Sequence, residues 1–162
     1  MLIFFEQNAD ICVIVYIYAY EVRPKMAVYI QQKVGYIMED IRMQQIEVLE
    51  TGIEYVQKLV PAMKEILPEL RGDEKEDTMD YLNQIIEGIN FVIEIVNATM
   101  NLINEKEEIL SKDGIEEQVQ LLNAGLQQKD NAKVAQALED GMLSFMDIFY
   151  QVAGVIVARE KA

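Results

Sequence analysis

Hydrophobic residues recur at helical spacing from about residue 27 to the end of the chain. The first such stripe consists of Val34, Ile37, Met38, Ile41 and Val48. From residue 49 to residue 70 the apolar positions alternate steps of four and three, which is typical of the seam of a left-handed helical bundle. This pattern predicts a helix over residues 27–67. Pro61 removes a backbone donor and disfavours helix at the preceding residue, so we expect a kink or a short break there.

A second helix is predicted over residues 78–110, after a turn in the segment RGDEKEDT (71–78). Gly72 is the expected stop of the first helix, and Asp77 is the expected cap of the second. Two adjacent apolar seams run along this second helix and give it a wide hydrophobic face. The first seam is Met79, Leu82, Ile86, Ile89, Ile93, Val96, Met100 and Ile103, and the other is Tyr81, Ile85, Val92, Ile95, Leu102 and Ile109.

Two further helices complete the pattern, at residues 114–127 and 131–158. Asp113 with Glu116 resembles a capping box for the short third helix, and Asp130 is the expected cap of the fourth. The predicted fold is therefore all-α, an antiparallel up-down bundle of three long helices and one short helix. Because the third helix is less than half as long as the second, we expect uncovered apolar surface that a second copy, the N-terminal segment or a partner would cover.

The first 25 residues follow a different pattern. ICVIVYIYAY (11–20) is a continuous β-branched and aromatic run, too short to span a bilayer as a helix. One interpretation is a strand, paired as a hairpin with the preceding LIFFE. The other is a mis-assigned start, with the natural chain beginning at Met26, because Glu21-Val22 can be encoded by a ribosome-binding sequence. The expected domains are an apolar segment, residues 1–25, and a helical bundle, residues 26–162.

Composition narrows the function classes. The net charge of −14 disfavours nucleic acid and anionic membrane surfaces as partners. The single cysteine, Cys12, cannot form an internal disulfide, which fits a reducing, cytoplasmic location. The chain contains no histidine, which excludes Ser-His-Asp and Cys-His nucleophiles, HExxH zinc sites and Glu-x-x-His di-iron sites. We predict no catalytic, cofactor-binding or metal-binding residues and no cofactor.

Asparagine recurs along one face of the predicted second helix, although it is a poor helix former. The residues are Asn83, Asn90, Asn97, Asn101 and Asn104. One interpretation is an ordinary solvated face, and the other is a surface whose amide groups bind a partner or line a polar interface in a bundle. These five asparagines are the candidate interaction surface.

A carboxylate-only enzyme is the alternative function. All-α nucleotide pyrophosphohydrolases use ExxE followed by ExxD to hold Mg²⁺ against a triphosphate. Glu47 and Glu50, followed by Glu74 and Asp77, are similar to that pattern.

The segments LETGIEYVQKLVPAMKEIL, IIEGINFV and LQQKDNAKVAQALEDGMLSFMDIF resemble uncharacterised small helical-bundle proteins of Firmicutes. The last segment departs from that family's pattern, because DGMLSF lacks a proline. The resemblance implies a cytoplasmic bundle and no known activity. Together with the nine methionines, which suit an adaptable binding face, the sequence predicts a non-enzymatic, adaptor or chaperone-like protein. Its expected partner is a protein helix or a second copy in a homodimer.

Overall fold

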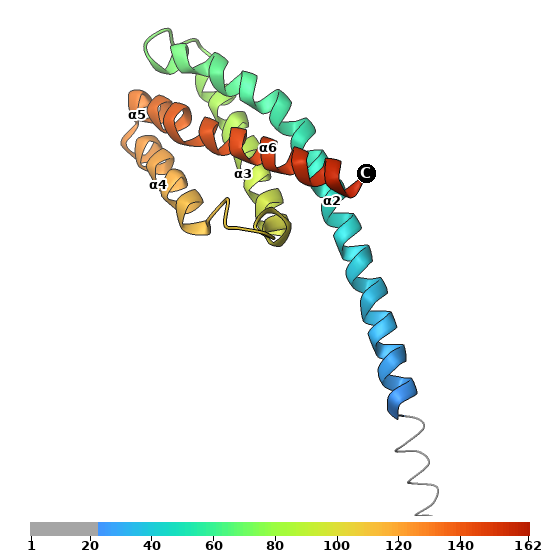
Figure 1. Cartoon of the computed structure of the whole chain (residues 1–162). Coiled ribbons are helices and arrows are strands. Elements are labelled where there is room, and N and C mark those ends of the chain that lie inside the picture. The colour runs from blue at the N-terminus through green and yellow to red at the C-terminus, as the bar shows by residue number, and fades with distance from the viewer. Residues whose placement is uncertain (1–22) are drawn as a thin grey trace, which may run out of the picture. The chain divides into compact units, whose positions relative to one another are not determined.

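The computed structural model describes residues 23–162, and these residues form helices and connecting segments without a strand (Figure 1). Of this part of the chain, 86% is helical, which confirms the all-α prediction. The chain divides into two units, residues 1–43 and residues 44–162. The predicted strand or hairpin within residues 1–25 lies almost entirely outside the described residues, and residues 23–25 are helical.

The first element is α2, Arg23–Leu70. It is longer at both ends than the sequence pattern predicted, and it continues through Pro61 and Pro68 without interruption. A short break at Val60 is therefore ruled out, whereas a kink at this point stays a prediction. Leu59 and Met63 flank Pro61 and are buried in the core, so tertiary packing holds the helix where propensity alone would end it.

The next helix is α3, Thr78–Ile103, and its two predicted seams face the core except at Met79, which is 42% exposed. The helix ends seven residues earlier than predicted because Asn104 turns the chain. Asn104 Oδ1 accepts hydrogen bonds from the backbone N–H groups of Ile109 at 2.9 Å and Leu110 at 3.1 Å. Asn104 Nδ2 donates to the carbonyl of Leu110 at 2.7 Å. The side chain thus closes a loop after the last helical turn, and Ile109 is left 40% exposed.

The predicted start of α3 at residue 78 is correct, whereas two of the predicted capping residues between α2 and α4 do not cap a helix. Gly72 has a φ of +132° and terminates α2 as expected. Asp77 precedes α3, but its side chain makes no capping bond. The next helix, α4, Lys112–Gln128, is capped by Ser111, whose Oγ accepts from the Gly114 N–H at 3.1 Å, rather than by Asp113.

The last helical stretch runs from residue 131 to residue 160 and contains a change of helical type. It consists of α5, Asn131–Gln136, the π-helical segment η2, Ala137–Met142, and α6, Leu143–Glu160. Asp130 caps α5 as predicted, accepting from the Lys133 N–H at 3.1 Å. The π-helical segment was not predicted, since periodicity averaged over a long helix does not resolve one wider turn.

Within residues 44–162, helices α2, α3 and α6 approach one another closely at Gly52. A Cβ at this position would lie 2.7 Å from Cζ of Phe149 on α6 and 3.1 Å from Cγ2 of Ile95 on α3. Three helices therefore meet where α2 has no side chain. Gly125 on α4 fits the start of α5 in the same way, because its Cβ would lie 2.9 Å from the Val134 nitrogen. Figure 1 shows α6 crossing α3, with which it is in contact, while α4 lies beside α5.

Candidate interaction surfaces

The N-terminal half of α2 is apolar and exposed. Between residues 24 and 43 no side chain is buried, and the first core residue of the described chain is Ile46. Ten large hydrophobic side chains are exposed there: Met26, Val28, Tyr29, Ile30, Val34, Tyr36, Ile37, Met38, Ile41 and Met43. The sequence pattern placed Val34, Ile37, Met38 and Ile41 on one helical stripe, and these residues are helical and exposed.

Five of the exposed side chains form one continuous line along this helix. We call Met26, Ile30, Val34, Ile37 and Ile41 the α2 stripe. Their exposed fractions run from 48% for Val34 to 58% for Ile37. Steps of three and four residues keep neighbouring members on one side of a helix, so the stripe is a single apolar face. The sequence signal for its upstream part, Met26 and Ile30, was the same spacing extended by two turns.

The charge of this helix differs from that of the chain as a whole. Residues 23–43 contain four basic side chains and two acidic ones, a net charge of +2 against −14 for the whole chain. Lys33 Nζ lies over the ring of Tyr29, 5.8 Å from its centroid, a cation–π contact between residues one turn apart. The Lys33 ammonium group therefore lies at the edge of the stripe and does not cover it.

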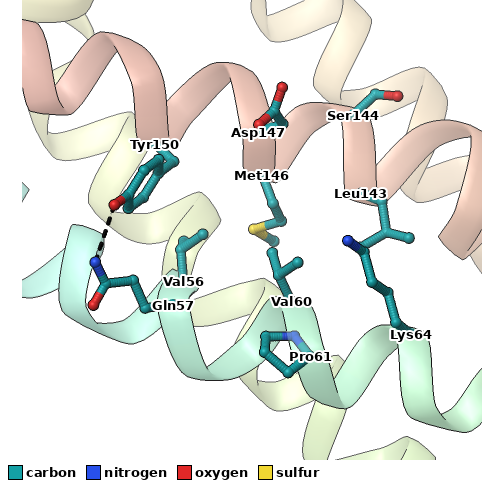
Figure 2. Close-up of a pocket in the computed structure, with 10 residues that line it drawn as sticks. All are labelled: Val56, Gln57, Val60, Pro61, Lys64, Leu143, Ser144, Met146, Asp147 and Tyr150. Atoms are coloured by element: carbon teal, nitrogen blue, oxygen red, sulfur yellow. Dashed lines mark hydrogen bonds between the residues drawn. The ribbon is translucent and has the colours of Figure 1, made fainter.

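A second apolar surface lies between α2 and α6, within residues 44–162. It is an open cavity of about 470 Å³ whose apolar lining includes Val56, Val60 and Met146. Figure 2 shows Val60 and Met146 pointing towards one another from the two helices. At one end Gln57 Nε2 donates a hydrogen bond to Tyr150 Oη at 3.0 Å.

Polar groups at the edge of this cavity could orient a bound side chain. Lys64 from α2 and Asp147 from α6 contribute one positive and one negative charge. Pro61 has no N–H, so the carbonyl of Gln57, four residues earlier, lacks its usual helical donor. The cavity thus combines an apolar lining with a few polar groups, which is the general composition of binding pockets.

The five candidate asparagines do not share one role. Asn83, Asn90 and Asn97 are exposed on α3, and the last two line a shallow cavity beside α4. Asn101 bonds to α2, where its Oδ1 accepts from Gln45 Nε2 at 2.8 Å. Asn104 closes the loop after α3, as described above. An interaction surface at Asn83, Asn90 and Asn97 stays a prediction, while Asn101 and Asn104 use their amides within the molecule.

The two carboxylate pairs of the ExxE…ExxD pattern, Glu47 with Glu50 and Glu74 with Asp77, lie apart from each other. Glu50 precedes the end of α2 by 20 residues, which is roughly 30 Å of helix, and Glu74 follows only four residues after that end. Glu50 is instead paired with Lys161. Across residues 23–162 no three acidic or cysteine side chains are grouped so that they could hold a metal ion.

The most buried carboxylate, Glu69, has a structural role. Its side chain is 8% exposed and pairs with Lys75, and Thr78 Oγ1 donates a hydrogen bond to its Oε2 at 2.8 Å. The hydrogen bonds from Lys75 and Thr78 outweigh desolvation and lower the pKa of Glu69 below its ordinary value of 4.5. The cluster fixes the turn between α2 and α3.

Two stretches of the described chain, Thr78–Ile103 and Asn131–Glu160, are long and apolar enough to cross a membrane by length and composition alone. The core helices of soluble proteins have the same property, so this is weak evidence for a membrane protein. Every second or third residue of α3 is buried against the rest of the protein, including Leu82, Ile89 and Val96.

Comparison with known proteins places most of the chain in one family. No curated protein and no solved structure matches it. A family described as a domain of unknown function, DUF8042, matches residues 47–151. The match lies within the unit of residues 44–162 and excludes the α2 stripe. Because it covers well over half of the sequence, the chain belongs to the DUF8042 family.

Proposed function

We propose that the protein is a non-enzymatic interaction protein that binds a helix through the α2 stripe. The observation that carries the proposal is the contrast along α2. Residues 24–43 expose ten large hydrophobic side chains and bury none, whereas the same helix buries a regular set of side chains from Ile46 onwards. Contiguous exposed apolar surface of this kind is typical of protein interaction sites.

The physical argument concerns the stability of the helix itself. Helices in proteins owe most of their stability to packing of an apolar face, and residues 24–43 have no buried side chain to supply it. Covering a half-exposed isoleucine or valine contributes on the order of 1 kcal/mol. A bound helix would place its own apolar residues at i, i+3, i+4 and i+7 along the stripe. Binding would therefore stabilise this part of α2 as well as the complex.

A photo-activatable cross-linking amino acid, placed at one position of the chain at a time, tests the proposal in the cells that produce the protein. Ile37 lies on the stripe, and Glu39 lies nearly opposite on the same helix and is also exposed. We expect a covalent adduct from position 37 and little or none from position 39. Equal labelling of the two positions, or no adduct from position 37, would contradict the proposal. Mass spectrometry of the adduct then shows which chain was bound.

A further inference from the structure

We infer that the α2 stripe binds the same stripe of a second copy of this chain, with the two helices antiparallel. The inference rests on the proposed function and names its partner. Four members of the stripe, Ile30, Val34, Ile37 and Ile41, are spaced by four, three and four residues. This is the spacing of a heptad seam, in which each apolar side chain inserts between side chains of a facing helix.

The seam is complementary to the same seam of a second copy that runs in the opposite direction. When two copies run antiparallel about a twofold axis between residues 35 and 36, Val34 faces Ile37 of the second copy, and Ile30 faces Ile41 of the second copy. Each contact occurs twice, as symmetry requires of an isologous interface. All four layers then pair one β-branched aliphatic side chain with another, so the seam closes without a polar residue.

Charge along the edge of the seam selects the antiparallel direction. Lys33 directly precedes Val34 and Asp40 directly precedes Ile41, so both lie on the same edge. In an antiparallel pair that edge faces itself, and Lys33 lies beside Asp40 of the second copy on both sides of the axis. In a parallel pair it would face the other edge, which carries Gln31 and Met38 and offers no ion pair. The cation–π contact with Tyr29 places the Lys33 ammonium along this edge.

Sedimentation of the intact chain is the first test. We expect a species of twice the chain's 18.6 kDa. Ile37→Asp should shift the protein to the monomer, because it would bury two carboxylates in the seam. Gln32→Asp is the matched control, since it adds the same charge at an exposed position on the side of the helix away from the stripe and should leave the dimer intact. Circular dichroism should show the same helical content for both variants.

Single-cysteine variants in a Cys12→Ser background test the direction. An Ile30→Cys chain and an Ile41→Cys chain, treated separately with a short thiol cross-linker, should not form covalent dimers. In an antiparallel pair identical positions lie about 16 Å apart along the axis. A mixture of the two variants should cross-link efficiently. Efficient cross-linking of each variant alone, with none specific to the mixture, would establish a parallel pair and overturn the inference.

The outcomes separate this inference from the proposed function. A monomer at all concentrations whose position 37 forms an adduct with a different protein would overturn self-pairing and leave the interaction role supported. A monomer whose position 37 forms an adduct only within its own chain would overturn both. A monomer that binds vesicles of anionic lipid through the stripe would also overturn both, since the partner would then be a membrane surface rather than a helix.

Discussion

Gly52 allows α2, α3 and α6 to meet, and its replacement gives the sharpest stability prediction for a single residue. In an open helix Gly→Ala stabilises by up to about 1 kcal/mol. Here the new methyl group would lie 2.7 Å from the ring of Phe149, a fully buried side chain. Overpacking of this kind costs about 1–3 kcal/mol, so Gly52→Ala should destabilise the protein in urea unfolding.

Gly154 on α6 is the matched control for that experiment. A Cβ at Gly154 meets no atom within 4 Å, so Gly154→Ala should stabilise or be neutral. Equal gains in the free energy of unfolding for both variants would contradict the close packing at Gly52.

Asn104 differs from the candidate asparagines Asn83, Asn90 and Asn97 because its side chain closes the loop after α3. Asn104→Ala removes three hydrogen bonds to backbone groups, and leaves those groups of Ile109 and Leu110 without these partners. We expect a loss of about 1–3 kcal/mol in the free energy of unfolding. Asn97→Ala, at an exposed position on α3, should leave the free energy of unfolding unchanged or raise it by a few tenths of a kcal/mol through helix propensity. Similar losses for the two would show that the loop does not depend on Asn104.

Glu69 predicts a specific acid sensitivity. Its pKa is lowered in the folded state, so the stability that it contributes is present above its unfolded pKa and is lost as the pH falls through its folded pKa. The same sign holds for Glu139, whose pKa is lowered by the Arg71 guanidinium. Unfolding midpoints measured between about pH 7 and about pH 3 should therefore fall less steeply for Glu69→Gln than for the wild type. Parallel profiles would contradict this role for Glu69.

At the scale of the helix, a charge exchange on α2 tests the direction of pairing without disturbing the apolar seam. Lys33→Glu alone and Asp40→Lys alone should each weaken the dimer about tenfold, because each creates two like-charge contacts. The double variant restores opposite charges across an antiparallel pair, so its dissociation constant should return towards that of the wild type. A double variant as weak as the sum of the two single variants would argue against the Lys33–Asp40 contact. Sedimentation equilibrium gives all four constants.

The helices could be predicted from the sequence wherever the apolar spacing persists. Their ends could be predicted only where tertiary contacts do not override the capping and turn preferences of the local sequence. The spacing along α3 predicted its buried face correctly except at Met79 and Ile109, which are exposed. The end of α3 was wrong because Ile109 continued the spacing while the Asn104 side chain closed the loop. Ser111 rather than Asp113 caps α4 because it is the residue that reaches the Gly114 N–H. Such choices depend on geometry that a sequence pattern does not contain.

The candidate interaction surfaces could be predicted only in part from the sequence, for a related reason. Uncovered apolar surface on a long helix was expected, but the sequence did not indicate which part of which helix would carry it. A stripe buried within its own chain and a stripe left for a partner have the same spacing, and Val34 and Leu49 differ only in what the fold places against them. The cavity between α2 and α6 depends on two segments about 90 residues apart in sequence, and periodicity does not show that they are close.

At the scale of the whole molecule, the charge is distributed in a way that fits the two units. Residues 23–43 are mildly basic, although the chain carries a net charge of −14. The family match and every buried hydrophobic of the described chain lie beyond residue 43. The core of the family domain therefore does not use the α2 stripe, which can change partner without altering that core.

Hydrogen exchange on the intact chain measures directly whether the stripe is covered. An apolar helix with nothing packed on it opens and exchanges its amide protons quickly, whereas a paired helix is protected. We predict that protection of residues 26–41 rises with protein concentration, while protection of the core helices α3 and α6 stays constant. Ile37→Asp should abolish the concentration dependence. Fast exchange of residues 26–41 at every concentration, or slow exchange that does not change with concentration, would contradict self-pairing of the α2 stripe.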